Sequence, residues 1–166
     1  MYLIIGCGYV GGRVAEMLSS TAHSVVAVTH TEASARRIEA EKRVTVFVCD
    51  VGELIDVVRL RAQLPSPPNA ILHCASSSRG GAEMYEHVFV KGCANLAEVF
   101  PTTPIVFTSR TSVYPQTDGS VVTEESDATP DRRTSQFLRA AEDFILLRGG
   151  VVARLAAFTV RGAPLC

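Results

Sequence analysis

The first twelve residues of the chain combine an apolar strand, a glycine-rich turn and the start of a helix. They have the sequence MYLIIGCGYVGG, in which Gly6, Gly8 and Gly11 form the pattern Gly-x-Gly-x-x-Gly. In this pattern the first glycine makes a tight turn, the second lets a pyrophosphate approach the backbone, and the third allows close helix–strand packing. The N–H groups and the dipole at the helix N-terminus favour an anionic group. The segment therefore predicts a dinucleotide-binding loop.

Short apolar runs alternate with helical patterns along the rest of the chain. Strands are expected at residues 2–5, 24–29, 44–49, 70–74, 104–108 and 151–155, and helices at 10–20, 32–41, 52–63, 84–100 and 135–147. Apolar strands separated by helices indicate a parallel sheet that is covered on both faces. With right-handed crossovers, the pattern predicts one α/β domain with a doubly wound sheet of about six strands.

Composition excludes several classes of partner. The 166 residues include 16 basic and 17 acidic side chains, and no basic stripe is interleaved with aromatic residues, so a nucleic-acid partner is not expected. The N-terminus has neither the basic region nor the cleavage site of a signal peptide. No apolar run is long enough to cross a membrane. We therefore expect a soluble cytoplasmic protein of one domain.

The cysteines and histidines do not predict a metal site. The five cysteines lack Cys-x-x-Cys spacing, and the four histidines form no pair at helical spacing. Cys7 has two interpretations, because the glycine loop requires a small residue there and a helix N-terminus can also activate a thiol.

The end of the second expected strand bears on the type of dinucleotide. An acidic residue at this position commonly binds the ribose of NAD, whereas a nearby basic residue accommodates the additional phosphate of NADP. Here the strand leads into Thr29, His30 and Thr31, and Arg36 and Arg37 follow. This favours NADP over NAD. The alternative is that the two arginines form a solvated helix face and that neighbouring Glu32 restores NAD binding.

Two further segments after strands are candidates for the site. Asp50 ends the third expected strand, where it is a candidate adenine contact or, alternatively, a cap of the following helix. Residues 114–133 form a long polar connection with turn signals at Asp118, Gly119 and Pro130. A connection of this length is usually functional or disordered, and it follows the carboxyl end of a strand, where such sheets bind ligands.

Several segments together resemble one family. GCGYVG at 6–11, VCDV at 48–51, ILHCA at 71–75, IVFTS at 105–109, SVY at 112–114 and Glu142 in RAAE resemble the extended and atypical short-chain dehydrogenase/reductases, especially their sugar-nucleotide epimerase/dehydratase-like branch. The resemblance implies an NAD(P)-binding Rossmann domain over residues 1–166. Expected cofactor contacts are Gly6, Cys7, Gly8, Tyr9, Val10, Gly11, Thr29, His30, Thr31, Arg36, Asp50, Val51, Cys74, Ala75 and Ser76.

The catalytic residues of that family are not found at the expected positions. The family uses a Tyr and a Lys four residues apart, with a Ser or Thr hydroxyl that orients the substrate oxygen. Counting from Glu142 and Val113, these positions hold Thr134, Leu138 and Arg110. No Tyr-x-x-x-Lys occurs anywhere, since the only lysines are Lys42 and Lys91.

Neighbouring side chains are candidates to take the roles of the missing catalytic groups. The candidates are Ser109, Arg110, Thr111 and Tyr114. Arg110 is suited to binding an anionic group, and its alternative is an ion pair with Glu124, Glu125 or Asp127. Tyr114 is a candidate acid, and its alternative is packing within the turn.

The C-terminus is the second departure from the family. Residues 152–158 resemble the segment where the family's sixth strand leads into a substrate-binding lobe of roughly 100 residues, but the sequence ends at Cys166. We expect this lobe to be missing, supplied by a partner or excluded from this chain, and the apolar residues 151–158 to form a homodimer contact. Three functions remain open: an NAD(P)-dependent oxidoreductase or epimerase-like enzyme with atypical residues, a non-catalytic dinucleotide sensor or subunit, and a shortened family member.

Overall fold

The computed structural model describes residues 1–42, 44–77 and 80–156 of the chain. Its strands are β1 (Tyr2–Ile5), β2 (Val25–Thr29), β3 (Thr45–Val48), β4 (Ala70–His73), β5 (Ile105–Arg110) and β6 (Val151–Leu155). Its longer helices are α1 (Tyr9–Ser20), α2 (Glu32–Lys42), α3 (Leu54–Gln63), α5 (Gly92–Val99) and α6 (Arg133–Leu147). The short elements are α4 (Ala82–Tyr85), the π-helix η1 (Glu86–Lys91) and the 3-10 helix η2 (Thr111–Val113).

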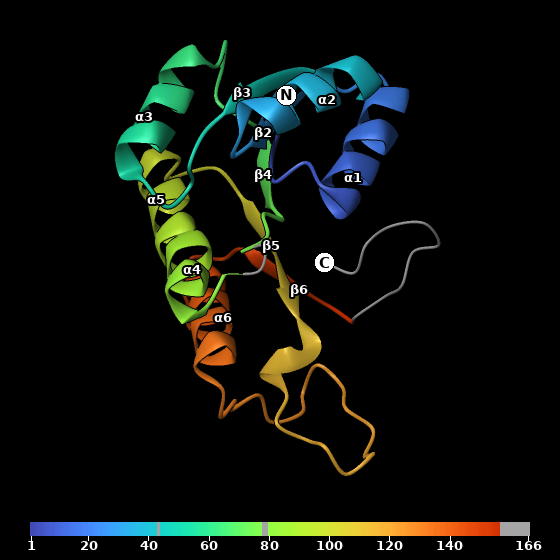
Figure 1. Cartoon of the computed structure of the whole chain (residues 1–166), viewed down its shortest axis with the longest axis vertical. Coiled ribbons are helices and arrows are strands. Elements are labelled where there is room, and N and C mark those ends of the chain that lie inside the picture. Colours follow the sequence, from blue (N-terminus) through green and yellow to red (C-terminus); the bar gives the residue numbers. More distant parts are fainter. Residues whose placement is uncertain (43, 78–79, 157–166) are drawn as a thin grey trace.

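The six strands form one sheet in the order β3-β2-β1-β4-β5-β6, and every neighbouring pair is parallel. This confirms the predicted doubly wound α/β sheet. The order reverses between β1 and β4, where such sheets bind ligands at the carboxyl ends of their strands. Helices α1 and α2 lie on one side of the sheet, and α3, α4, α5 and α6 lie on the other (Figure 1).

Side chains along each strand point alternately to the two faces of the sheet, and this separates two apolar cores. Leu3 and Ile5 of β1 face the larger core, which includes Phe89 and the helices α3, α5 and α6. Ile4, between them, faces a smaller core with Ala15 of α1 and Ile38 of α2. Because every second residue of a strand points to the same face, a single short strand contributes to both cores. The N-terminal strand is thereby fixed, and with it the glycine loop that follows.

The helical run after β4 differs from its predicted form. The sequence predicts one helix over residues 84–100, whereas the structure has α4, η1 and α5 in direct succession over residues 82–99. In the π-helical segment between Glu86 and Lys91 each backbone hydrogen bond spans one residue more than in an α-helix, so the turns are wider. The smaller differences lie at the ends of elements: β5 extends to Arg110, and β3 and β4 end one residue earlier than predicted.

Candidate nucleotide-binding site

Two of the three glycines in the N-terminal loop are required by close packing against the end of β4. Gly6 has φ +91°, and a Cβ there would lie 2.3 Å from Ala75 Cα. A Cβ at Gly11 would lie 2.3 Å from the Gly6 carbonyl oxygen and 2.8 Å from Cys74 Sγ. Cys74 Sγ also donates a hydrogen bond to that oxygen at 3.1 Å. Gly6, Gly11 and Cys74 therefore hold the loop against the sheet.

Gly8 has a different environment from the other two glycines. It is the N-cap of α1, and a Cβ built there would meet no atom within 4 Å. The first turn of α1 contains no acidic side chain. The first N–H groups of a helix have no acceptor within the helix, and the helix dipole makes this end positive. The open space at Gly8 therefore lies where the backbone is suited to an anion.

A cavity of about 430 Å³ extends from this loop along the carboxyl ends of β1, β2, β3 and β4. It is lined by Ile5, Gly6, Cys7, Gly8, Val28, Thr29, His30, Thr31, Ser34, Arg37, Ile38, Cys49, Asp50, Val51, Ala75, Ser76, Ser77, Gly80, Met84, His87 and Val88. Its size lies in the range of small-molecule and cofactor sites. Its position is the switch point at which ligands bind in doubly wound sheets.

The cavity brings together most of the side chains expected from the sequence. The expected residues along it are Gly6, Cys7, Gly8, Thr29, His30, Thr31, Asp50, Val51, Ala75 and Ser76. The expected residues that do not line it are Tyr9, Val10, Gly11, Arg36 and Cys74. Gly11 and Cys74 pack behind the loop, and Tyr9 is exposed. Of the arginine pair, Arg37 lines the cavity in place of Arg36.

The end of the cavity near α2 is polar and includes one basic side chain. Thr31 Oγ1 accepts a hydrogen bond from the Ser34 backbone N–H at 3.2 Å and donates to Ser34 Oγ at 3.0 Å. This pairing leaves the Ser34 hydroxyl proton available to a ligand. Arg37 lies one turn further along α2, and Glu32 is not among the lining residues. The arrangement offers donors and a positive charge where the second strand ends.

Asp50 lies between two histidines. Its Oδ1 accepts hydrogen bonds from the Gly52 N–H at 3.0 Å and from His87 Nε2 at 2.9 Å. Its Oδ2 lies 3.4 Å from His30 Nε2. The N-cap of α3 is Glu53, so Asp50 closes the turn before the helix and does not cap the helix itself.

Ser77 contributes a buried hydroxyl to the cavity wall. Its residue surface is 2% exposed, and within the described part of the chain its Oγ has no hydrogen-bond partner. A buried polar atom without a partner costs about 1–3 kcal/mol, and such atoms in native proteins are usually satisfied by water or a ligand. The open space at Gly8, the orphaned Ser77 hydroxyl and the polar end at Arg37 together fit a phosphate-containing dinucleotide.

Several lining residues are not predicted from the sequence, among them Ser34, Ser77, Met84 and His87. Ser34 had a usable signal, because it stands three residues after Thr31 in the spacing of a helix cap. Met84 and His87 approach the cavity from the α4–η1 run, which lies far along the sequence from the glycine loop. No local pattern predicts that approach.

Two cysteine thiols near the site, those of Cys49 and Cys74, are not activated. Burial raises the pKa of Cys49 and Cys74 to about 12, so both thiols are protonated at neutral pH. Among the residues that the structure describes, no three His, Cys, Asp or Glu side chains are arranged to hold a metal ion. Cys166 lies outside the described residues.

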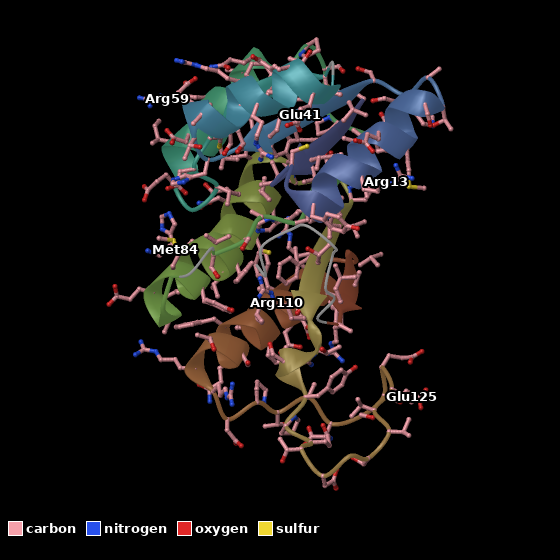
Figure 2. The ribbon with its side chains drawn as sticks, turned by 45° about the vertical axis from the view of Figure 1, so that its right-hand side comes forward. Arg13, Glu41, Arg59, Met84, Arg110 and Glu125 are labelled. Atoms are coloured by element: carbon pink, nitrogen blue, oxygen red, sulfur yellow. The ribbon has the colours of Figure 1, made fainter. Side chains whose placement is uncertain are left out.

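The positions of the family's catalytic groups hold side chains with other roles. Leu138 is fully buried in the larger core, and Thr134 lies in the first turn of α6. Arg110 is the last residue of β5 and forms no ion pair with Glu124, Glu125 or Asp127 in the described part of the chain. Figure 2 shows Arg110 in the middle of the molecule and Glu125 on the loop at its lower edge.

A buried ion-pair network connects α6, β6 and the turn after β5. Arg154 donates to the Glu142 carboxylate through Nε at 3.0 Å and Nη2 at 2.7 Å, and Arg139 Nη1 donates to it at 2.9 Å. Burial alone would raise the pKa of Glu142, but hydrogen bonds from Arg154 and Arg139 hold it below its usual range. Arg154 Nη1 also donates to the Tyr114 hydroxyl at 2.8 Å. Tyr114 is therefore held in a structural network.

The fold and the cavity define a nucleotide-binding α/β protein of the Rossmann type. Residues 2–140 match the model of the NAD dependent epimerase/dehydratase family. The chain belongs to this family. The family's name gives NAD, a nicotinamide dinucleotide, as the cofactor. The comparison with curated proteins gives no match.

Solved structures show the same fold. A putative epimerase from Burkholderia cenocepacia J2315 has a TM-score of 0.80 and 20% identity, with 98% of this chain and 56% of that chain covered. The UDP-Glc/GlcNAc 4-epimerase of Campylobacter jejuni has a TM-score of 0.74 and 18% identity, with 89% of this chain and 49% of that chain covered. The ADP-L-glycero-D-manno-heptose-6-epimerase of Helicobacter pylori has a TM-score of 0.74 and 17% identity, with 91% of this chain and 52% of that chain covered. The chain spans about half the length of these proteins.

The described residues contain no helix with the length and apolar character of a membrane span.

Proposed function

We propose that this chain binds a nicotinamide dinucleotide in the 430 Å³ cavity and prefers NADP(H) to NAD(H). The observation that carries the proposal is the continuity of the cavity. It joins the helix N-terminus at Gly8 to the polar end at Thr31 and Arg37. NADP(H) requires both ends at once, because its pyrophosphate and its additional phosphate are attached to different oxygens of the adenosine ribose.

The glycine loop supports the pyrophosphate part of the proposal. Gly8 offers open space above the N-terminus of α1, and the dipole of this helix favours the negative charge. The buried Ser77 hydroxyl, which has no partner within the described residues, is a donor for the adjacent part of the ligand. We assign Gly8 and Ser77 to the pyrophosphate side of the cavity.

The preference for NADP(H) follows from the charge at the end of β2. No carboxylate occupies the position that would bind the two ribose hydroxyls of NAD, and Glu32 does not line the cavity. His30, Ser34 and Arg37 are all lining residues. A guanidinium and neighbouring hydroxyl and imidazole donors suit a phosphate better than a bare hydroxyl. NAD(H) is the alternative ligand and would bind here without those charge-assisted bonds.

Neighbouring arginines provide a matched test of this preference. Arg37→Gln should weaken NADPH binding about tenfold, because a hydrogen bond to a charged group is worth about 1.5–3 kcal/mol, and should leave NADH binding nearly unchanged. Arg36→Gln is the control, since it changes the same charge on the same helix outside the cavity wall. Calorimetric titration of both variants measures the effect. Equal NADPH losses in the two variants would contradict the assignment of Arg37.

For the reaction, we propose oxidoreductase or epimerase-like chemistry that does not use a Tyr–Lys pair. A bound nicotinamide supplies hydride transfer. Arg110 at the end of β5 forms no ion pair with an acidic side chain of the described chain, so its charge is available to an anionic group of a substrate. Arg110→Ala should then reduce NADPH turnover with carbonyl or sugar-nucleotide substrates. No turnover across a broad substrate panel, despite tight cofactor binding, would contradict this proposal.

A second candidate function is a non-catalytic dinucleotide sensor or subunit. The burial of Leu138 favours it, because the position expected for the catalytic lysine is part of the apolar core. A sensor requires different affinities for the reduced and oxidised cofactor. Equal affinities for NADPH and NADP⁺, with no change in partner binding, would exclude the sensor.

A further inference from the structure

The turn between β3 and α3 is held from outside by the helical run that follows β4. His87 of η1 hydrogen-bonds to the Asp50 carboxylate at 2.9 Å, across 37 positions of sequence. Asn95 of α5 donates its side-chain amide to the Val51 carbonyl oxygen at 3.0 Å, across 44 positions. The side chain and the backbone of this turn therefore each have a distant partner. Asp50 and His87 also line the cavity.

The backbone leaves a specific space for the His87 ring. A Cβ at Gly52 would lie 2.3 Å from His87 Nε2 and 2.4 Å from Cδ2, closer than real contacts allow. Only glycine at position 52 lets the ring reach Asp50. The His87 side chain is 22% exposed, and its Nδ1 lies 4.0 Å from Glu53 Oε1. The ring is thus confined on several sides.

This confinement makes the two oxygens of Asp50 unequal. Oδ1 accepts from both the Gly52 N–H and His87 Nε2. Oδ2 has His30 Nε2 at 3.4 Å, a long contact from a side chain that is 72% exposed. A carboxylate is an acceptor only, so Oδ2 is left to accept from a donor within the cavity. The exocyclic amino group of adenine is such a donor.

We propose that His87 is a positioning residue for base recognition: it fixes the Asp50 carboxylate so that Oδ2 faces the amino group of adenine. The inference rests on the proposed dinucleotide binding. His87 does not itself need to contact the base. It removes the rotational freedom of the carboxylate, which otherwise has to be lost when the ligand binds. The π-helical segment, a form found often at functional sites, carries the histidine to this point.

The test compares NADPH with its hypoxanthine analogue, in which a carbonyl oxygen replaces the amino group. Wild-type protein should prefer NADPH about tenfold or more, because the analogue leaves Oδ2 opposite an acceptor. His87→Leu should lower NADPH affinity and leave the affinity for the analogue nearly unchanged, so the ratio of the two dissociation constants falls to about 2 or less. His87→Gln retains a donor near the position of Nε2 and should restore most of the ratio.

A second variant reaches the same carboxylate without changing the histidine. Gly52→Ala places a methyl group in the space of the ring and should also abolish the base preference. His23→Leu is the matched control, because His23 is exposed, lies outside the cavity and contacts Tyr2. It should keep the wild-type ratio. Calorimetric titration gives all dissociation constants, and thermal unfolding reports whether each variant is folded.

The outcomes separate this inference from the proposed function. If the wild type binds neither compound, dinucleotide binding itself is wrong. If the wild type binds both compounds equally, the positioning of Asp50 for adenine is wrong. If His87→Leu and Gly52→Ala retain the wild-type ratio, or weaken both compounds equally, His87 has only a structural role and the inference is overturned.

Discussion

At the scale of single residues, the glycines of the N-terminal loop have separate roles that their common motif does not distinguish. Gly6 combines a positive φ with a Cβ position 2.3 Å from the Ala75 backbone, so a side chain is excluded by the fold. Gly8 has neither constraint. Packing therefore does not explain the absence of a side chain at Gly8, and we propose that a ligand does.

This contrast predicts opposite effects of the same substitution. Gly6→Ala should cost about 2 kcal/mol or more of folding free energy, through backbone strain and the clash with Ala75. Gly8→Ala should leave the free energy of unfolding within about 0.5 kcal/mol of wild type and reduce NADPH affinity at least about tenfold. Urea unfolding and calorimetry measure the two effects. A destabilised Gly8→Ala variant with normal affinity would show that Gly8 is structural.

His73 predicts a stability change with pH. It is fully buried, its Nε2 donates to the Val88 carbonyl oxygen at 3.0 Å, and Nδ1 has no partner in the described chain. Burial outweighs the Val88 bond and lowers the pKa of His73 to about 4. An unfolded histidine binds a proton below about pH 6.5, so the unfolded state gains protons first. The contribution of His73 to the free energy of unfolding is fully present above that pH and is lost as the pH falls toward 4.

The expected loss is about 2 kcal/mol between pH 7.5 and pH 5. Urea unfolding at the two pH values measures it. The His73→Leu variant should be less stable at pH 7.5, because Val88 loses its donor, but should lack this pH slope. The pH range in which Glu142 contributes to stability does not overlap with that of His73. The pKa of Glu142 is lowered from 4.5, so its stabilisation is lost only at more acidic pH. An unchanged slope in His73→Leu would contradict the assignment.

The residues of the site were predictable only where they are local in sequence. The glycine loop and the residues that end β2, β3 and β4 follow directly from strand order, and most of them line the cavity. The choice between Arg36 and Arg37 could not be predicted from the sequence, because successive residues of a helix point about 100° apart. His87 was also inaccessible, since its partner Asp50 is 37 positions away.

At the scale of elements, Glu142 and Arg154 join the last helix to the edge strand. Within the described residues β6 pairs only with β5, and its side chains are partly exposed, so the ion pair is a major contact between α6 and the sheet edge. The Glu142 side chain is fully buried, whereas the side chain of Arg139 is 32% exposed. Breaking a buried pair leaves an uncompensated charge.

Glu142→Gln should therefore destabilise the protein by about 3 kcal/mol, because the buried Arg154 loses its anionic partner. Arg139→Gln is the matched control and should cost less than about 1 kcal/mol, because its guanidinium remains accessible to water. Chemical denaturation at pH 7.5 measures both variants. Similar losses in the two variants would show that burial of the pair does not determine its importance.

Helices and strands were predictable because each has a clear period of apolar residues. All six predicted strands occur, with ends shifted by two residues at most. The π-helical segment was not predicted, because one short stretch of wider turns hardly changes the apolar pattern of residues 84–100. That small change matters at the site, since Met84 and His87 both reach the cavity from this run.

At the scale of the whole molecule, we propose that the chain forms a homodimer through its C-terminal edge. Leu147 is 88% exposed and Val151 is 57% exposed, and they lie at neighbouring ends of α6 and β6. Residues 157 and 158 of the expected contact lie outside the described residues. Light scattering at micromolar concentration should give twice the mass of one chain, and Leu147→Asp should restore the mass of one chain. A monomeric wild type would contradict the dimer.

The most direct test of the account is calorimetric titration of the wild-type chain with NADPH, NADP⁺, NADH and NAD⁺ in one preparation. The cavity that joins Gly8 to Arg37 predicts one site per chain for the phosphorylated cofactors, with NADPH binding at least about tenfold tighter than NADH. No binding of any of the four, or tighter binding of NADH than of NADPH, would contradict it.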